Sequence, residues 1–286
     1  MNEWHGGRLD AAQAAWVTER VSDPVLVRDM SWGLVETTVL HVRSGSDELV
    51  VKAAGPSDTH LPREIAAHPS YTAPLVAAGR AARLRDASLE ARVILLDYLP
   101  GELVLGTHAE WSPGTYAQAG ALLRQLHEQD AMPDADYEAR ATAKQLHWLD
   151  QPHRIDPSVA ARVRALLESA PAPTVTLVPA HGDWHPRNWL VDDGMIKAID
   201  FGRFAFRPAS TDLTRMAAQQ WRERPDLEAA FFDEYGPDPR DPDLWRLDAL
   251  REAVGTACWA FKVGDEQFER HGHRMLAEAL AAYDAA

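Results

Sequence analysis

The chain has 286 residues, of which 46% are hydrophobic and 25% are charged, values typical of a soluble globular protein. Its 29 Lys and Arg against 43 Asp and Glu give a formal net charge of −14. This charge disfavours a nucleic-acid partner or a membrane partner of anionic lipid, because both need a basic face. The acidic excess could instead favour a cationic partner, or it could serve solubility alone. The length suggests one large domain or two lobes.

A single cysteine, Cys258, lies in an apolar stretch, so an intramolecular disulfide is excluded and a small core residue is predicted. The N-terminal residues lack a basic segment followed by an apolar run, and no window reaches the ~20 apolar residues of a spanning helix. We therefore expect a cytoplasmic protein.

The first third of the chain combines short strands with helices. Apolar periodicity predicts a helix over residues 10–20. Runs rich in Val, Leu and Thr, separated by short turns, predict an antiparallel meander. Pro62 fits a first helical position, so a helix should begin there. The predicted strands cover residues 24–30, 35–43, 48–53 and 91–98, the last ended by Leu99-Pro100-Gly101.

After Gly101 the pattern becomes mainly helical. Two short strands, at residues 174–178 and 196–199, flank a loop rich in His, Asp, Asn and Trp. The sequence thus predicts an α+β fold of two lobes, with a small antiparallel-sheet lobe over residues 1–99 and a larger helical lobe over residues 100–286. The predicted helices cover residues 111–129, 137–149, 157–170, 211–221, 227–235, 242–262 and 267–283.

The densest cluster of chemically active side chains is His181-Gly182-Asp183-Trp184-His185-Pro186-Arg187-Asn188, followed by Ile199-Asp200-Phe201-Gly202-Arg203. Zinc ligation is one interpretation, because His181 and His185 are four residues apart. Gly182 and Pro186 disfavour the helix that this spacing needs, and a zinc site requires three or four ligands.

Phosphoryl transfer explains more of this cluster. Asp183 and Asn188 have the spacing of the Asp and Asn of a kinase catalytic loop, and an Asp-Phe-Gly follows at Asp200. Asp183 could accept the proton of an attacking hydroxyl, and Asn188 and Asp200 offer the oxygen ligands that Mg²⁺ prefers. A hairpin over residues 189–199, with a tight turn at Asp193-Gly194, would bring the two ligands together.

His-Gly-Asp, the following Asn and Ile-Asp-Phe-Gly-Arg resemble the aminoglycoside phosphotransferase family of kinase-like enzymes. The resemblance is specific over residues 179–216 and weaker elsewhere. It implies a two-lobed protein-kinase-like fold in which residues 1–99 bind the nucleotide and end in the hinge, while residues 100–286 carry catalysis and the acceptor site. It further implies an ATP- or GTP-dependent O-phosphotransferase that uses Mg²⁺.

The resemblance assigns nucleotide contacts in the first lobe. Lys52, at the end of an apolar strand, would hold the phosphates and pair with Glu64. The alternative is that Lys52 is an ordinary edge-strand charge and Glu64 an ordinary solvated charge on a helix. The loop at Ser31 and Gly33 would cover the phosphates, but its single glycine also fits a plain hairpin turn. Asp97, Tyr98 and Leu99 would lie beside adenine, which the main chain recognises.

Other residues would support the catalytic loop. Asp212, at a helix start, is expected to accept backbone N–H groups and brace the loop, and His181 is expected to pack within it. Arg203 could contact a phosphate or form a salt bridge in the loop. We expect Arg187 and Lys197 to be solvated and His127 to pack between helices.

The acceptor is expected to be a small cationic molecule, with an aminoglycoside or a basic peptide antibiotic as the first choice. Acidic residues of the helical lobe would bind it, although acidic runs are usually solvated faces. A kinase for choline, homoserine or a sugar is an alternative of the same family, and a catalytically silent nucleotide-binding protein is another. The acceptor-binding candidates are Asp233, Glu234, Asp238, Asp265 and Glu266.

Overall fold

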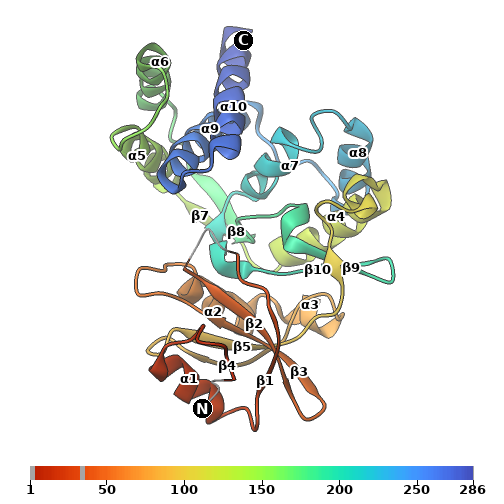
Figure 1. Ribbon diagram of the computed structural model, residues 1–286. Helices are drawn as coiled ribbons and strands as arrows, with labels where there is room; N and C mark the ends of the chain where they lie inside the picture. The colour runs from red at the N-terminus through yellow and green to blue at the C-terminus, as the bar shows by residue number, and fades with distance from the viewer. Residues whose placement is uncertain (1–3, 33–35, 286) are drawn as a thin grey trace.

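A five-stranded antiparallel sheet and a mainly helical part make up the computed structural model, which describes residues 4–32 and 36–285 (Figure 1). The sheet has the order β1-β2-β3-β5-β4. β1, β2 and β3 pair in chain order, as the meander predicts, whereas β3 pairs next with β5 and β4 lies at the edge. The predicted α+β arrangement of two lobes is confirmed. The strands are β1 Val25–Asp29, β2 Thr38–Ser44, β3 Asp47–Ala53, β4 Leu84–Ser88 and β5 Val93–Asp97.

Alternation along β3 divides its side chains between the two faces of the sheet. Leu49, Val51 and Ala53 are buried in a core that α1, Ala11–Thr18, covers. Lys52 therefore points to the opposite face, toward the helical lobe. The sequence did not predict β4, because its outward-facing Arg85 and Asp86 are exposed and leave little apolar alternation.

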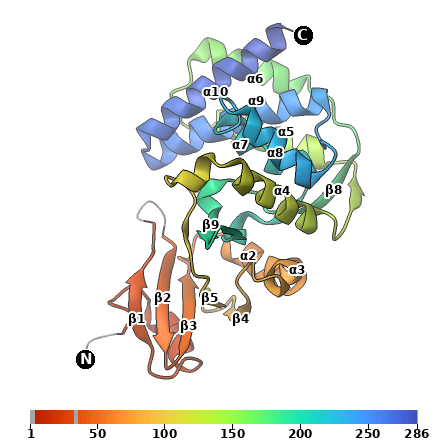
Figure 2. The ribbon, with the colours of Figure 1, turned by 90° about the vertical axis from the view of Figure 1, so that its right-hand side faces the viewer.

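Two helices, α2 (Leu61–Ser70) and α3 (Ala73–Ala77), lie between the sheet and the helical lobe (Figures 1 and 2). Pro62 stands in the first turn of α2, as predicted. Ala67, Leu75 and Ala81 belong to the same hydrophobic core as the helices that follow residue 100. The core therefore does not divide at residue 99, because α2 and α3 pack onto the helical lobe.

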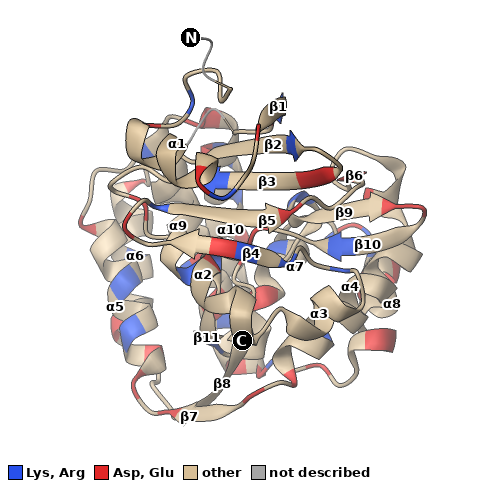
Figure 3. Ribbon diagram, turned by 90° about the horizontal axis from the view of Figure 1, so that it is seen from below, with Lys and Arg blue, Asp and Glu red and all other residues tan. Residues whose placement is uncertain are grey.

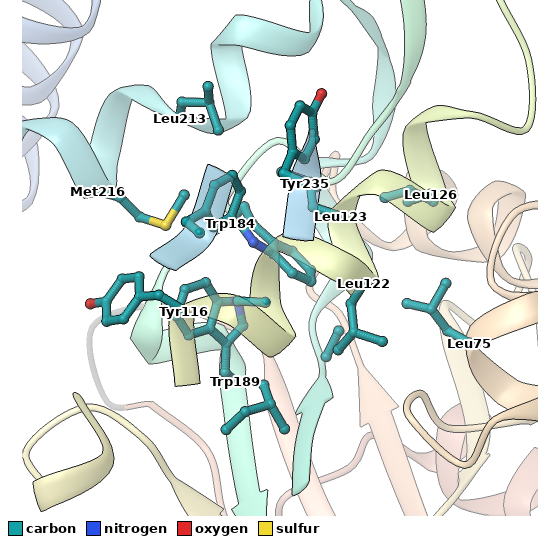
Figure 4. Close-up of a cluster of buried hydrophobic side chains, with 14 of the residues drawn as sticks. Leu75, Tyr116, Leu122, Leu123, Leu126, Trp184, Trp189, Leu213, Met216 and Tyr235 are labelled. Carbon is teal, nitrogen blue, oxygen red and sulfur yellow. The ribbon is translucent and has the colours of Figure 1, made fainter. Parts of the chain in front are cut away.

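The helical lobe is built around α4, which packs along α8 (Figure 4). Four of its helices begin with a proline, whose fixed φ suits the first helical turn. A Cβ at Gly120 of α4 would collide with the carbonyl oxygen of Phe231, so only glycine allows this close approach. The helices are α4 Pro113–His127, α5 Tyr137–Leu149, α6 Pro157–Glu168, α7 Thr214–Ala218, α8 Pro225–Tyr235, α9 Pro242–Val263 and α10 Glu266–Asp284.

The helix predicted over residues 211–221 is wrong in extent. A 3₁₀ turn, η4 (Ala209–Asp212), precedes a five-residue α7, and Gln219 leaves the helical region at φ −119° and ψ −95°. The carboxylate of Asp212 accepts hydrogen bonds from the backbone N–H groups of residues 181 and 182, which ties the turn to the loop that follows β8. A second 3₁₀ turn, η1 (His108–Trp111), precedes α4.

Two small sheets carry the predicted functional loop. β8, Val175–Ala180, pairs with β7, Met132–Asp134, and with β11, Ala205–Arg207. β9, Trp189–Asp192, and β10, Met195–Ala198, form the predicted hairpin, and β6, Glu102–Leu103, adds to it. Asp193 and Gly194 have φ of 47° and 76°, as a two-residue turn requires. Among the described residues, no helix combines the length and apolarity needed to span a bilayer.

Candidate active site

The buried carboxylate of Asp212 holds the backbone of the loop between β8 and β9. Asp212 accepts hydrogen bonds from the N–H groups of His181, at 2.8 Å, and Gly182, at 2.6 Å. His127 donates to the same carboxylate over 3.1 Å, and its other ring nitrogen accepts from the Tyr235 hydroxyl over 2.8 Å. Burial raises the pKa of Asp212, but these donors outweigh burial and lower it. Asp212 thus contacts the backbone of the loop, and His127 is buried beside Asp212 and Tyr235.

Both ring nitrogens of His181 form hydrogen bonds with backbone groups. Its Nδ1 accepts the N–H of Asp183 at 3.3 Å, so its Nε2–H donates to the Ile199 carbonyl at 3.1 Å. No nitrogen of this ring is left for a metal. Nor does any group of three His, Cys, Asp or Glu side chains suited to a metal ion occur within residues 4–32 and 36–285. Gly182 has a φ of 80°, and a Cβ there would collide with the Arg203 carbonyl oxygen.

Asp183 is 5% exposed and lies among positive charges. Arg215 Nε is 2.9 Å from Asp183 Oδ1, and Arg203 Nε is 3.7 Å from Oδ2. Burial raises the pKa of Asp183, but Arg215 and Arg203 outweigh it and hold the pKa well below its usual range. Asp183 is therefore ionised at neutral pH and is a weak base that can still accept a hydrogen bond from a hydroxyl.

His185 stands next to Asp183, with Nε2 3.5 Å from Oδ1. Burial is the main reason that its pKa falls to about 3, and Arg215 and Arg187 add to this effect. The ring is therefore neutral at physiological pH. The positive charges that balance Asp183 are those of Arg215 and Arg203.

Asn188 and Asp200 come together through the hairpin. Asn188 Nδ2 donates to the Asp183 carbonyl over 2.8 Å, which leaves its amide oxygen available, and the Ile199 N–H donates to the Asn188 carbonyl over 3.0 Å. Asp200 has a φ of 64°, a strained backbone conformation that is often found at functional sites. An amide oxygen and a carboxylate fit Mg²⁺, which would complete its shell with phosphate and water oxygens.

Lys52 links the two lobes. Its Nζ lies 2.5 Å from Glu64 Oε2 and 3.0 Å from Asp200 Oδ1. Burial lowers the pKa of Lys52, but Asp200 and Glu64 raise it above its usual value, and Lys52 in turn lowers the pKa of Asp200. Lys52 and Glu64, which the sequence analysis expected to pair, are in direct contact. The lysine points at the carboxylate that follows the hairpin.

The loop after β1 is partly described. The Ser31 hydroxyl accepts the Val39 N–H at 3.0 Å, and the Ser31 N–H donates to the Asp29 carboxylate, so Ser31 closes the β1–β2 connection. Gly33 lies outside the described residues. Trp32 lies under the guanidinium of Arg187, 4.5 Å from its ring centroid, so Arg187 is not simply solvated as expected.

At the predicted hinge, several groups are already paired. Arg83 and Arg85 bind the Asp97 carboxylate. Tyr98 stacks on His41 with ring centroids 3.8 Å apart, and its N–H donates to the Glu48 carbonyl over 3.0 Å. Leu99 is half-buried.

Lys197, expected to be solvated, is instead 4% exposed. Its ammonium donates to the Pro100 carbonyl over 3.0 Å and pairs with Asp192 over 2.7 Å. Because Lys197 lies on β10 and Pro100 directly follows the hinge, this buried contact ties the hairpin to the connection between the lobes.

The predicted acceptor carboxylates are exposed or engaged in local contacts of the helical lobe. Asp233, Glu234 and Glu266 are exposed, Asp238 pairs with Arg240 over 2.5 Å, and Asp265 caps α10 by accepting the Phe268 N–H. Acidic residues are spread over strands and helices in the view of Figure 3. Within the described ranges, none of these five forms an ion pair with Arg203 or Arg215.

Sequence reasoning missed Arg215, which contacts Asp183, and Glu252, which contacts Arg215. Arg215 on α7 contacts Asp183 directly, and Glu252 on α9 lies 3.4 Å from Arg215 Nε. No local motif marks either, because they meet only when α7 packs on α9. Glu252 also lines a largely apolar pocket of about 230 Å³ between α7, α9 and α10, whose wall includes Trp245 and Met275.

A two-lobed fold with a lysine–glutamate pair on one lobe, and an Asp–Asn loop and an Asp-Phe-Gly on the other, defines a kinase-like phosphotransferase. A family model described as the phosphotransferase enzyme family matches residues 30–247. The chain belongs to this family and is a phosphotransferase. The predicted family and fold class are confirmed.

Solved structures resemble the whole chain at low identity. Choline kinase from Streptococcus pneumoniae has a TM-score of 0.67 at 14% identity over 94% of this chain and 99% of that one. A thermostable aminoglycoside phosphotransferase mutant, in a ternary complex with ADP and hygromycin B, has 0.67 at 15% over 94% and 97%. Macrolide 2′-phosphotransferase from Brachybacterium faecium has 0.55 at 18% over 91% and 95%. A search of curated protein sequences finds no match.

Proposed function

We propose that the protein transfers the γ-phosphoryl group of ATP to a hydroxyl of a small molecule, with Mg²⁺. The observation that carries this proposal is the convergence of Lys52, Asp200, Asn188 and Asp183 from both lobes on one place. The nucleotide would bind between residues 1–99 and residues 100–286, and the structurally similar complex with ADP supports this placement. Such a reaction fits the cytoplasmic location expected from the sequence.

Each side chain has a distinct task in this mechanism. Lys52 holds the phosphates, while Glu64 and Asp200 hold the lysine. Asn188 and Asp200 would bind Mg²⁺, which supplies neutralisation of phosphate charge. Ser31, Gly33 and the main chain at Asp97, Tyr98 and Leu99 would surround the rest of the nucleotide. Backbone contacts at the hinge would use groups other than the Tyr98 N–H, which is already bonded.

Asp183 orients the acceptor hydroxyl toward the γ-phosphorus. The hydroxyl oxygen forms a bond to phosphorus as the bond from phosphorus to the β–γ bridging oxygen breaks, and ADP leaves. The hydroxyl proton passes to Asp183 or to the transferred phosphoryl group late in the reaction. Because the pKa of Asp183 is low, its contribution is positioning more than proton abstraction. His181, Asp212 and Arg203 keep the loop in place.

Antibiotics of the aminoglycoside or basic peptide type remain one proposed acceptor class, in line with the similar aminoglycoside and macrolide phosphotransferases. Small metabolites form the second class, in line with the similar choline kinase. A silent nucleotide-binding protein is disfavoured, because Lys52, Asp183, Asn188 and Asp200 are all present and placed together.

The test is ADP formation by the purified protein with Mg·ATP and a panel of aminoglycosides, basic peptide antibiotics, choline, homoserine and sugars. We expect at least one acceptor to stimulate ADP release, and Asp183→Ala to remove that stimulation while nucleotide affinity is kept. Glu223→Ala, an exposed change on the helical lobe, is the matched control and should leave turnover intact. Stimulation that persists in Asp183→Ala would contradict the assignment.

A further inference from the structure

One side of α2 faces the turn that follows the second proposed Mg²⁺ ligand. This turn is η3, Phe201–Arg203, a short 3₁₀ helix. His60 stands directly before α2 with helical φ and ψ of −88° and −42°. His60, Glu64 and His68 are four residues apart and therefore share one side of this helix. Glu64 forms the ion pair with Lys52 described above, and the two histidines contact η3.

The contacts of the two histidines differ in kind. The His60 Nδ1–H donates to the Gly202 carbonyl over 2.9 Å, because a carbonyl oxygen can only accept. The buried His68 ring packs edge-on against Phe201, with ring centroids 5.6 Å apart. His60 and Gly202 are 142 positions apart in the chain, so no local motif marks their contact.

The position of His60 is fixed by the backbone around it. The Asp58 carboxylate accepts the N–H groups of His60 and Leu61, both over 2.8 Å. The approach of η3 to this end of α2 is close, since a Cβ added at Gly202 would lie 3.1 Å from His60 Cβ and 3.2 Å from Asp200 Oδ1. The side chain that donates to Gly202 therefore starts from an ordered backbone.

The backbone of Asp200 has to be held on both sides. Its φ of 64° and ψ of 70° lie in the left-handed region, where a residue other than glycine persists only if its surroundings hold it. On the preceding side, the N–H and the carbonyl of Ile199 are both hydrogen-bonded to the catalytic loop. On the following side, the hydrogen bond from His60 holds Gly202.

We propose that His60 is a positioning residue for phosphoryl transfer, because its hydrogen bond to the Gly202 carbonyl holds Asp200 in the conformation that binds Mg²⁺. This inference rests on the proposed function, in which Asn188 and Asp200 bind the metal. Lys52 does not replace His60, since Lys52 contacts the carboxylate of Asp200 whereas His60 acts on the backbone that follows it. The N-terminal end of α2 thus acts on a metal ligand of the helical lobe.

Two substitutions separate the hydrogen bond of His60 from its bulk. In His60→Asn, the amide nitrogen is attached to Cγ as Nδ1 is, so it can donate to the same carbonyl. In His60→Leu, the side chain branches at the same atom and carries no donor. His60 is exposed, so neither substitution removes a buried side chain. Ala66→Leu, at an exposed position of α2, is the matched control.

Hydrogen exchange of the protein without nucleotide measures the order of the turn itself. The Phe204 N–H, bonded to the Phe201 carbonyl over 2.9 Å, reports opening of η3. We expect exchange over residues 199–204 to be about threefold to tenfold faster in His60→Leu, as the loss of one hydrogen bond implies. Exchange in His60→Asn and Ala66→Leu should match the wild type.

Two results of the exchange experiment overturn the inference. The first is equal exchange over residues 199–204 in His60→Leu and the wild type, since the turn would then not depend on His60. The second is equally fast exchange in His60→Leu and His60→Asn, since the bulk of the imidazole would then be responsible rather than its hydrogen bond.

Binding of AMP-PNP with and without Mg²⁺ measures the consequence for the metal. We expect the gain in affinity that Mg²⁺ provides to be about threefold to tenfold smaller in His60→Leu and to be kept in His60→Asn, with the affinity for metal-free AMP-PNP unchanged in both. A full gain in His60→Leu overturns the inference. A lower metal-free affinity in His60→Leu also overturns it, since His60 would then act on the nucleotide. If Mg²⁺ gives the wild type no gain, the Mg²⁺ role in the proposed function is contradicted instead, and hydrogen exchange still decides whether His60 holds the turn.

Discussion

Asp248, on α9, couples the stability of the helical lobe to pH. It is 8% exposed, 3.3 Å from the Ser210 hydroxyl and 3.3 Å from Arg251 Nη1, whose stronger contact is with Glu138 at 2.6 Å. Burial raises its pKa from 3.8 to about 6, despite the opposing effect of Arg251. The folded protein thus holds this proton more tightly than the unfolded chain. The resulting stability is complete below about pH 4 and is lost as the pH rises through 6.

The size of the effect follows from the shift of the Asp248 pKa. At 1.36 kcal/mol per pKa unit, the ionised side chain costs about 3 kcal/mol of unfolding free energy at pH 8, and about 2 kcal/mol of this cost appears between pH 4.5 and 8. Asp248→Asn keeps the shape and removes the charge. We therefore expect its stability relative to the wild type to rise by about 2 kcal/mol over that pH range.

Urea denaturation at pH 4.5, 6 and 8 measures this difference. All other titrating groups are common to both proteins, so the difference between their curves isolates Asp248. Asp233→Asn, an exposed change on α8, is the matched control and should show no pH-dependent difference. A difference between Asp248→Asn and wild type that stays constant with pH would refute this explanation.

Three further changes have definite expected outcomes. Gly120→Ala should lower the unfolding free energy by about 1–3 kcal/mol in urea titrations, because its Cβ meets Phe231, whereas Gly114→Ala in the same helix has room and should be neutral or stabilising. Lys52→Met should weaken ATP binding by about tenfold or more in calorimetry, since a charge-assisted contact is lost, and undiminished affinity would exclude its phosphate role. Asp212→Asn should reduce kcat with little change in the KM for ATP, because it loosens the loop that holds Asp183; an unchanged kcat would contradict the bracing role.

Local signals in the sequence were enough for much of the fold. Asp193-Gly194 specified its turn, and prolines at the starts of helices marked their positions, because these residues restrict the backbone within a few neighbours. The hairpin predicted over residues 189–199 forms, and its ends meet in the hydrogen bond from the Ile199 N–H to the Asn188 carbonyl.

The contacts that the sequence did not reveal depend on packing between elements far apart in the chain. Arg215 and Glu252 are 37 positions apart and meet only because α7 lies on α9. The extended acidic run at residues 226–243 was visible in the sequence, yet its members Asp238 and Glu228 pair with Arg240.

The most direct test of phosphoryl transfer from ATP to an acceptor follows an isotope label from the γ-phosphate. ATP labelled in its γ-phosphate is incubated with Mg²⁺, an acceptor that stimulates ADP release, and either the wild-type protein or Asp183→Ala. We expect the wild type to move the label onto the acceptor and Asp183→Ala, which still binds nucleotide, to leave the acceptor unlabelled. Label recovered only as inorganic phosphate from the wild type, or equal transfer by Asp183→Ala, would contradict this expectation.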